Sequence, residues 1–284
     1  VAAHAAEGWA KVTGKPGVAI VTAGPGVTDA VTGLANAFQA PSPMVLIGGN
    51  AGIGDHLKGG LQDLDSATFL KPITKFSEQV KRTDRIPDYV SIAFRHATTG
   101  VPGPVYLEIP VDVVNGRAEE DAVHYPQAYR TESRAYGDPE YVSKVADILM
   151  ETERPMVLAG SDIWWTQAWD ELREFVEMID SPVFLNAMGR GSLPSDHPNV
   201  GSLGRRYGLV KSDTVILIGT PIDFRLGYGA DRMFPQNPNL IEIMQDGSKI
   251  GQNRDIDVGI VGDSKAVLGQ IMDELRSRRY KSPG

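Results

Sequence analysis

The sequence contains no cysteine, and this absence removes several chemistries at once. Disulfides, thiolate nucleophiles and cysteine-ligated metals are excluded, and thiol usage gives no indication of the cellular compartment. There is also no run of about 18 apolar residues, so we expect no membrane-spanning helix. The first residues do not have the pattern of a signal peptide, and a cytoplasmic protein is therefore expected.

Positive charge is scarce as well. The chain has 28 lysines and arginines against 36 acidic residues, which gives a formal net charge of −8. Nucleic-acid binding depends on clustered positive charge that releases counterions, so no nucleic-acid partner is expected. Histidine is equally sparse: none of the five is paired with another at metal-ligand spacing, and none supports a Ser-His-Asp triad. His56 lies in a glycine-rich loop, where a solvated side chain is the favoured interpretation.

One stretch, residues 14–39, organises the rest of the chain. Its short apolar run Val18 to Val21 is too brief for a helix and is stopped by Gly24-Pro25-Gly26. The apolar residues that follow recur at three- and four-residue steps, which predicts one buried stripe on a helix. Those residues are Val27, Ala30, Val31, Leu34, Ala35 and Phe38. A strand end, a glycine turn and a helix start therefore meet at one point, where ligands bind in open parallel sheets.

The same alternation of short apolar runs and amphipathic segments continues to the end of the chain. It predicts an α/β fold made of two consecutive, doubly wound parallel-sheet domains, the second of them Rossmann-like. A length of 284 residues is consistent with two domains of ordinary size. Residues 115–138 lack periodicity and read as an extended linker, which places the domains at 1–114 and 139–284.

Several motifs resemble the thiamine-diphosphate enzymes, in the branch that contains acetolactate synthase, benzaldehyde lyase and 2-hydroxyacyl-CoA lyase. The similarity begins in Ala5 to Lys11 and in Thr22 to Gly33, and it continues through Lys71 to Lys75 and Gly100 to Pro110. It extends to the second domain in Gly191 to Pro198 and Val261 to Asp263. The resemblance implies an N-terminally truncated pyrimidine-binding domain followed by a central domain.

The resemblance also implies roles for individual residues of the first domain. Gly24, Pro25, Gly26 and Asp29 would lie beside the thiamine diphosphate cofactor, although most relatives carry Asn at the position of Asp29. Gln62 matches the glutamine that reaches the substrate in this branch, and its amide can both donate and accept hydrogen bonds. The glutamate that activates the cofactor in the family would fall just before Val1. Simpler interpretations remain open, namely a tight turn without a ligand at Gly24 and a solvated side chain at Gln62.

Small residues follow successive strands of the second domain, and bare backbone there could bind a nucleotide. The resemblance implies FAD or ADP at this edge. Relatives that bind FAD have arginines where this chain has Val101 and Pro221, and an acid where it has Met244. We therefore expect weak or absent FAD binding, with ADP or an empty site favoured. The candidate nucleotide-binding residues are Gly160, Ser161, Gly219, Thr220, Asp223, Arg225, Asp246 and Asp263.

The magnesium-diphosphate motif of the family, Gly-Asp-Gly followed by Asn, has no match in the sequence. Gln245 to Ser248 lacks the first glycine, and Gly262-Asp263-Ser264 is followed by too few residues. The resemblance places the Mg²⁺ site in a third domain that this chain lacks, so the chain alone is expected to be inactive.

For the full-length parent the family implies a lyase or carboligase that acts on 2-keto acids, 2-hydroxy ketones or 2-hydroxyacyl-CoA. It also implies a homodimer or homotetramer. A non-catalytic nucleotide-binding or assembly module remains the alternative.

Overall fold

The structure is a computed structural model that describes residues 1–234 and 237–283. The chain forms two compact units, Val1–Glu132 and Ser133–Gly284. Each unit is built on its own parallel sheet, which confirms the predicted α/β class. None of the described helices combines the length and the apolar composition that crossing a membrane requires.

The first unit contains a four-stranded sheet in the order β1-β2-β4-β3. Its strands are β1 (Gly17–Val21), β2 (Met44–Asn50), β3 (Phe76–Gln79) and β4 (Pro104–Pro110). Strand β2 extends beyond its apolar run, which ends at Ile47, because Gly48 and Gly49 also pair with β4. Strand β3 was not expected, since its short and largely polar sequence lacks an apolar run.

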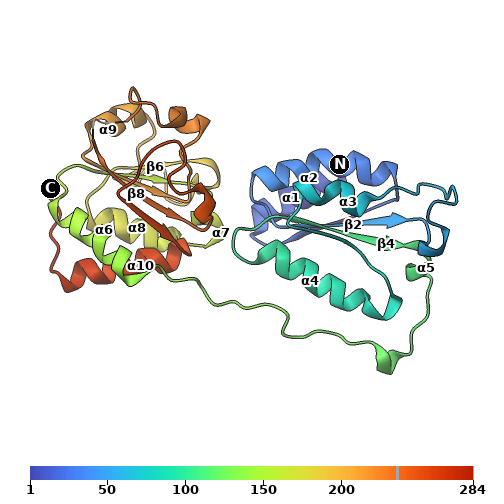
Figure 1. Cartoon of the computed structure of the whole chain (residues 1–284). Helices are drawn as coiled ribbons and strands as arrows, with labels where there is room; N and C mark the ends of the chain where they lie inside the picture. The colour runs from blue at the N-terminus through green and yellow to red at the C-terminus, as the bar shows by residue number, and fades with distance from the viewer. Residues whose placement is uncertain (235–236, 284) are drawn as a thin grey trace. The chain divides into compact units, whose positions relative to one another are not determined.

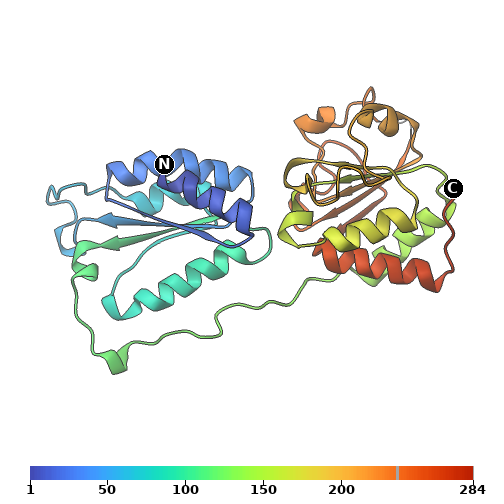
Figure 2. The same cartoon turned by 180° about the vertical axis from the view of Figure 1, so that it is seen from behind.

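Helices cover both faces of this sheet. Figures 1 and 2 show α1 (Ala2–Thr13), α2 (Pro25–Gln39) and α3 (Ser66–Leu70) on one face and α4 (Ile86–Thr98) on the other. Side chains alternate between the two faces: Leu46 packs toward α1 and α2, whereas its neighbour Val45 packs toward α4. The unit is completed by the single-turn helix α5 (Val111–Val114).

The buried stripe of α2 differs in part from the one that the sequence suggested. Val27, Ala30 and Leu34 are buried as expected, but Phe38 is 39% exposed and Ala37 occupies the buried position in the last turn. The buried face therefore runs through Val27, Ala30, Leu34 and Ala37, at steps of three and four residues.

The second unit contains a five-stranded sheet in the order β6-β5-β7-β8-β9. The strands are β5 (Pro155–Ala159), β6 (Val183–Leu185), β7 (Thr214–Ile218), β8 (Asn239–Met244) and β9 (Val258–Val261). Its helices are α6 (Pro139–Glu151), α7 (Ser161–Trp165), α8 (Trp169–Met178), α9 (Arg205–Lys211) and α10 (Ser264–Ser277). All the strands are parallel, so their carboxyl ends form one common edge of the sheet.

The second sheet is also buried on both faces. One core lies under α6, α8 and α10 and includes Val157, Ile216 and Ile241. The other lies against α9 and the segment that follows β7, and it includes Leu158 and Leu217. Parallel strands buried on both faces have continuous apolar sequences, which is why these strands were visible in the sequence.

Candidate active site

The glycine turn after β1 is organised around the start of α2. Gly24 is the N-cap residue with φ +56°, Pro25 occupies the first turn, and the amides of Val27 and Thr28 both donate to the Gly24 carbonyl at 3.0 Å. A non-glycine residue rarely adopts this backbone conformation, so the turn requires glycine at position 24. Pro25 and Asp29 are exposed beside it, at the carboxyl edge of the sheet.

Gln62 packs directly on this turn. A Cβ atom placed on Gly24 would lie 3.0 Å from the Cβ atom of Gln62, which is far tighter than ordinary side-chain packing. Gln62 itself has φ +62°, an uncommon conformation for a residue with a side chain. The structure therefore brings the stem of the Gln62 side chain against the glycine turn, although the two residues lie 38 positions apart in the sequence.

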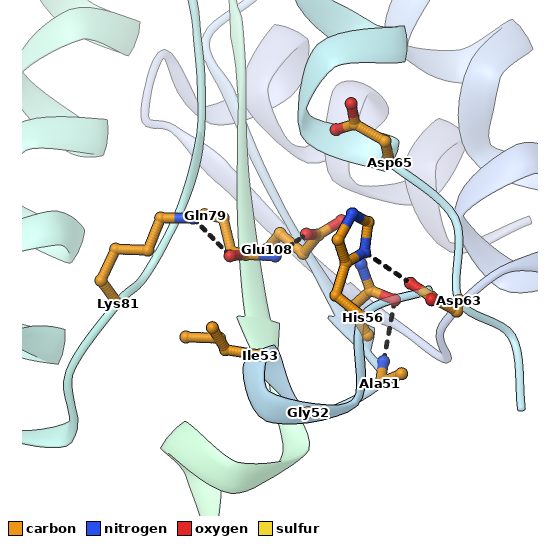
Figure 3. A pocket seen from close by; sticks show the side chains of 10 residues that line it. Ala51, Gly52, Ile53, His56, Asp63, Asp65, Gln79, Lys81 and Glu108 are labelled. Carbon is orange, nitrogen blue, oxygen red and sulfur yellow. Dashed lines mark hydrogen bonds and ion pairs between the residues drawn. The ribbon is translucent and has the colours of Figure 1, made fainter. Parts of the chain in front are cut away.

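A cavity of about 270 Å³ opens at the same edge of the sheet, beyond the ends of β2, β3 and β4 (Figure 3). Three carboxylates contribute to its wall, from Asp63, Asp65 and Glu108, together with one lysine, Lys81. The remaining lining residues are Asn50, Ala51, Gly52, Ile53, His56 and Gln79. The cavity is therefore acidic, and Asp63 and Asp65 belong to the same loop as Gln62.

Glu108 is the buried group of this cavity, with a residue exposure of 1%. Its Oε1 atom accepts a hydrogen bond from Gln79 Nε2 at 2.6 Å, whereas Oε2 has no hydrogen-bond partner among the residues that the structure describes. Tyr106 lies two residues earlier on the same face of the strand. Burial, the nearby charge of Glu108 and the interaction of the Tyr106 hydroxyl with Glu108 raise the pKa of Tyr106.

His56 and Asp63 contact each other within the loop that forms part of the cavity wall. His56 Nδ1 lies 3.4 Å from Asp63 Oδ1, and the second carboxylate oxygen accepts from the amide of Leu57 at 3.1 Å. The side chain of His56 is 61% exposed, so water can reach the imidazole ring. The sequence favoured a solvated histidine at this position. In the structure His56 is exposed, and it also lies beside the carboxylate of Asp63.

The carboxyl edge of the second sheet is filled by its own residues. A Cβ atom on Gly160 would lie 2.3 Å from the carbonyl oxygen of Gly219, and one on Gly219 would lie 2.4 Å from the Cβ atom of Asp162. These glycines therefore allow close approach of two backbone segments to each other. Thr220 is 2% exposed and accepts a hydrogen bond from Asn186 Nδ2 at 3.3 Å.

The charged candidates at this edge are also engaged. Arg225 Nε donates to both oxygens of Asp223, at 3.1 and 3.0 Å. Asp246 accepts from the amide of Ser248 at 3.0 Å and thereby caps a short turn. Asp263 caps α10 and pairs with Arg134 at 2.8 Å. Each of these side chains therefore has a structural role that needs no nucleotide.

Asp162 is an acidic residue of this edge that the sequence analysis did not single out. Burial raises its pKa to about 6, and the charges of Asp246 and Asp263 act in the same direction, against the hydrogen bond from the Gln245 amide. An anionic ligand at this edge would meet three carboxylates. Within the described residues, no group of three or more histidine or acidic side chains is arranged to hold a metal ion.

Two family models match the chain. Residues 1–69 match the N-terminal TPP-binding domain of thiamine pyrophosphate enzymes, and residues 142–271 match their central domain. The chain belongs to the thiamine pyrophosphate enzymes. The resemblance to this family that the sequence motifs indicated is thus confirmed.

Individual relatives agree with this assignment. The chain is 35% identical to the "Probable acetolactate synthase large subunit" of Methanocaldococcus jannaschii, over 99% of this chain and 49% of that protein. It is 31% identical to the 2-hydroxyacyl-CoA lyase of Arabidopsis thaliana, over 97% of this chain and 49% of that protein. The solved structure of benzoylformate decarboxylase from Polynucleobacter necessarius has a TM-score of 0.83 at 25% identity, covering 95% of this chain and 52% of that one. The chain spans about half the length of the curated relatives it matches.

In this member of the thiamine pyrophosphate enzyme family, sequence reasoning predicted the turn at Gly24 and singled out Gln62 as a candidate, but it missed the cavity. Glu108 is a single acid within the apolar run of β4, and such an acid is uncommon in a strand buried on both faces. Glu108 could therefore have been singled out from the sequence. Asn50 and Gln79 could not have been placed in the cavity wall, because their positions depend on which strands are neighbours in the sheet.

Proposed function

We propose that this chain is part of an enzyme that uses thiamine diphosphate to break or form a carbon–carbon bond next to a carbonyl. The substrate class is a 2-keto acid, a 2-hydroxy ketone or a 2-hydroxyacyl-CoA. The observation that supports the proposal is the packing of the Gln62 side chain on Gly24, the residue that begins the proposed cofactor turn.

The residues at this turn fit the pyrimidine half of the cofactor. Gly24 and Gly26 present backbone without side chains at the carboxyl end of β1, and Asp29 lies one helical turn further along α2. When bound, thiamine diphosphate supplies the nucleophile and the electron sink for chemistry at the carbonyl carbon. In this proposal Gln62 orients the substrate by donating its amide N–H to the carbonyl oxygen and accepting from a neighbouring hydroxyl. Mg²⁺ and the diphosphate would be held outside this chain.

The proposed partner at the second sheet is ADP, or no nucleotide at all, in preference to FAD. The engagement of Arg225 by Asp223 supports this, because the arginine proposed as the phosphate contact is already neutralised. The flavin spectrum and the nucleotide extracted from purified full-length protein test it, and stoichiometric FAD would contradict it. We also propose a homodimer or homotetramer, to be measured by sedimentation of the full-length protein.

The decisive experiment expresses the full coding region with thiamine diphosphate and Mg²⁺. Product formation is then assayed with pyruvate, with benzoin and with a 2-hydroxyacyl-CoA. Gln62→Ala is expected to lower kcat/KM by about 10² to 10³, the usual size of a lost positioning contact. Gln39→Ala is the matched control, because Gln39 is an exposed residue at the end of α2. Turnover of none of the three substrates, or equal activity of both variants, would overturn the proposal.

A further inference from the structure

The loop that carries Gln62 is joined at its two ends by one side chain, that of Asn50. Asn50 is the last residue of β2, and its Oδ1 atom accepts a hydrogen bond from the amide of Ala51 at 2.8 Å. Its Nδ2 atom donates to the carbonyl oxygen of Leu64 at 2.9 Å, 14 positions further along the chain. The side-chain amide of Asn50 therefore fixes both the point where the loop leaves the sheet and the point to which it returns.

Asn50 is a firm anchor because of where it lies in the sheet. The residue is 9% exposed, and β2 pairs with β1 on one side and with β4 on the other. Contacts further along the loop are longer or internal to it. The Gly54 amide lies 3.5 Å from Asp112 Oδ2, and the Leu57 amide donates to Asp63 of the same loop at 3.1 Å. The hydrogen bond from Asn50 is thus the shorter tie between the loop and the rest of the first unit.

Gln62 lies two positions before Leu64, in the returning part of the loop. Its φ of +62° is uncommon for a residue with a side chain, and its Cβ atom packs on Gly24. Such a backbone conformation persists only where the surrounding contacts fix it. We propose that Asn50 is a positioning residue, which holds Gln62 against the turn at Gly24 by joining the ends of loop 51–65. Its effect on catalysis rests on the proposed function, whereas its effect on the loop does not.

The two contacts require an amide at position 50. An asparagine side chain accepts with its oxygen and donates with its nitrogen, as the partners Ala51 and Leu64 demand. A carboxylate of the same size can still accept from Ala51 but cannot donate to the Leu64 carbonyl, so Asn50→Asp breaks one contact and keeps the shape. Asn50→Ala breaks both contacts. Asn115→Asp is the matched control, because it makes the same charge change at an exposed residue that follows α5 in the same unit.

Amide hydrogen exchange in this chain measures the effect on the loop. The Leu57 amide bonds to Asp63 Oδ2, and this bond requires the loop to keep its conformation. We expect the Leu57 amide to exchange about 5- to 30-fold faster in Asn50→Asp and in Asn50→Ala, the factor that corresponds to the loss of one hydrogen bond. Unchanged exchange of the amides of β4 establishes that the variants are folded. Unchanged exchange at Leu57 in both variants would overturn the proposal.

Steady-state kinetics of the full-length enzyme measure the effect on Gln62. Asn50→Asp and Asn50→Ala should each lower kcat/KM about tenfold, while the thiamine diphosphate concentration that gives half activation changes by less than about twofold. In a Gln62→Ala background, either substitution should change kcat/KM by less than about twofold, because the residue through which Asn50 acts is gone. A role in folding alone would lower activity by the same factor in both backgrounds, and that result would overturn the proposal.

The two measurements separate this inference from the proposed function. Faster exchange at Leu57 in a protein whose full-length form turns over no substrate would refute the proposed function and leave the loop contact standing. Turnover that Gln62→Ala lowers, but that both substitutions of Asn50 leave unchanged, would refute the positioning role and leave the proposed function standing.

Discussion

The carboxylate of Asp162 accepts a hydrogen bond from the backbone N–H of Gln245, with 2.9 Å between Oδ2 and N. This contact ties the start of α7 to the end of β8 at the carboxyl edge of the second sheet. Because the Asp162 side chain is buried beside Asp246 and Asp263, its ionised form is disfavoured. The edge that a nucleotide would use therefore carries a buried carboxyl group, Asp162, whose ionised form is unfavourable in the folded state.

The free energy of unfolding should depend on pH because of the ionisation of Asp162. The pKa of Asp162 rises from 3.8 in the unfolded chain to about 6 in the folded one, so the folded state binds more protons between these values. Stability is then lost as pH rises from about 4 through 6, by on the order of 3 kcal/mol. Asp162→Asn removes this loss and should be more stable than wild type at pH 7, with little difference at pH 4. Urea unfolding at several pH values measures the difference in free energy of unfolding between wild type and Asp162→Asn. Asp170→Asn is the control, because the Asp170 side chain is exposed. A difference that does not change with pH would contradict it.

Gly219 should be intolerant of any side chain. It has φ +61°, and a Cβ atom would lie 2.4 Å from that of Asp162, so Gly219→Ala combines backbone strain with a clash. Gly251 has φ +72° but open space around its Cβ position, so Gly251→Ala introduces the strain alone. We expect Gly251→Ala to cost about 1 kcal/mol and Gly219→Ala about 2 kcal/mol more. Chemical denaturation compares the two, and equal losses would show that the backbone at Gly219 relaxes.

The pairing of Asp223 with Arg225 should suppress binding of phosphates. Asp223→Asn removes the neutralising charge, while the amide oxygen can still cap the Arg225 amide as the carboxylate does. Affinity for ADP is expected to rise about 3- to 10-fold, measured by isothermal titration calorimetry. Asp231→Asn is the control, because Asp231 is 96% exposed in its side chain and pairs with a different arginine. An equal gain in both variants would indicate a general charge effect and not release of Arg225.

The contact between Gly24 and Gln62 predicts a catalytic effect of a small substitution. In the full-length enzyme, Gly24→Ala pushes against the Cβ atom of Gln62 and should lower kcat by about 3- to 10-fold, because the side chain must shift by a few tenths of an ångström and a misplacement of about 1 Å costs about 10²-fold. Gly14→Ala controls for positive φ alone, since Gly14 has φ +69° in the left-handed helical region and open space around it, whereas Gly24 has φ +56° and ψ −105°. Comparable turnover of the two variants would argue against a role for this contact.

Much of the fold follows from the sequence because it depends on local pattern. The apolar runs at β5, β7 and β8 are continuous, as strands buried on both faces require, and the apolar residues of α6 and α10 recur at helical spacing. The strand β3 was missed for the converse reason: it lies at the sheet edge, and its polar residues carry no periodic signal.

The sequence by itself determined the α/β class, the family and the glycine turn at Gly24, because each of these follows from the pattern of neighbouring residues in the chain. Only the tertiary structure decided that Gln62 lies on that turn, that the buried Glu108 contributes to the wall of a cavity, and that Arg225 is neutralised by Asp223. The physical reason is that strand order and side-chain pairing depend on contacts between segments distant in the chain. A local pattern specifies which residues form a strand, but not which neighbours their side chains meet.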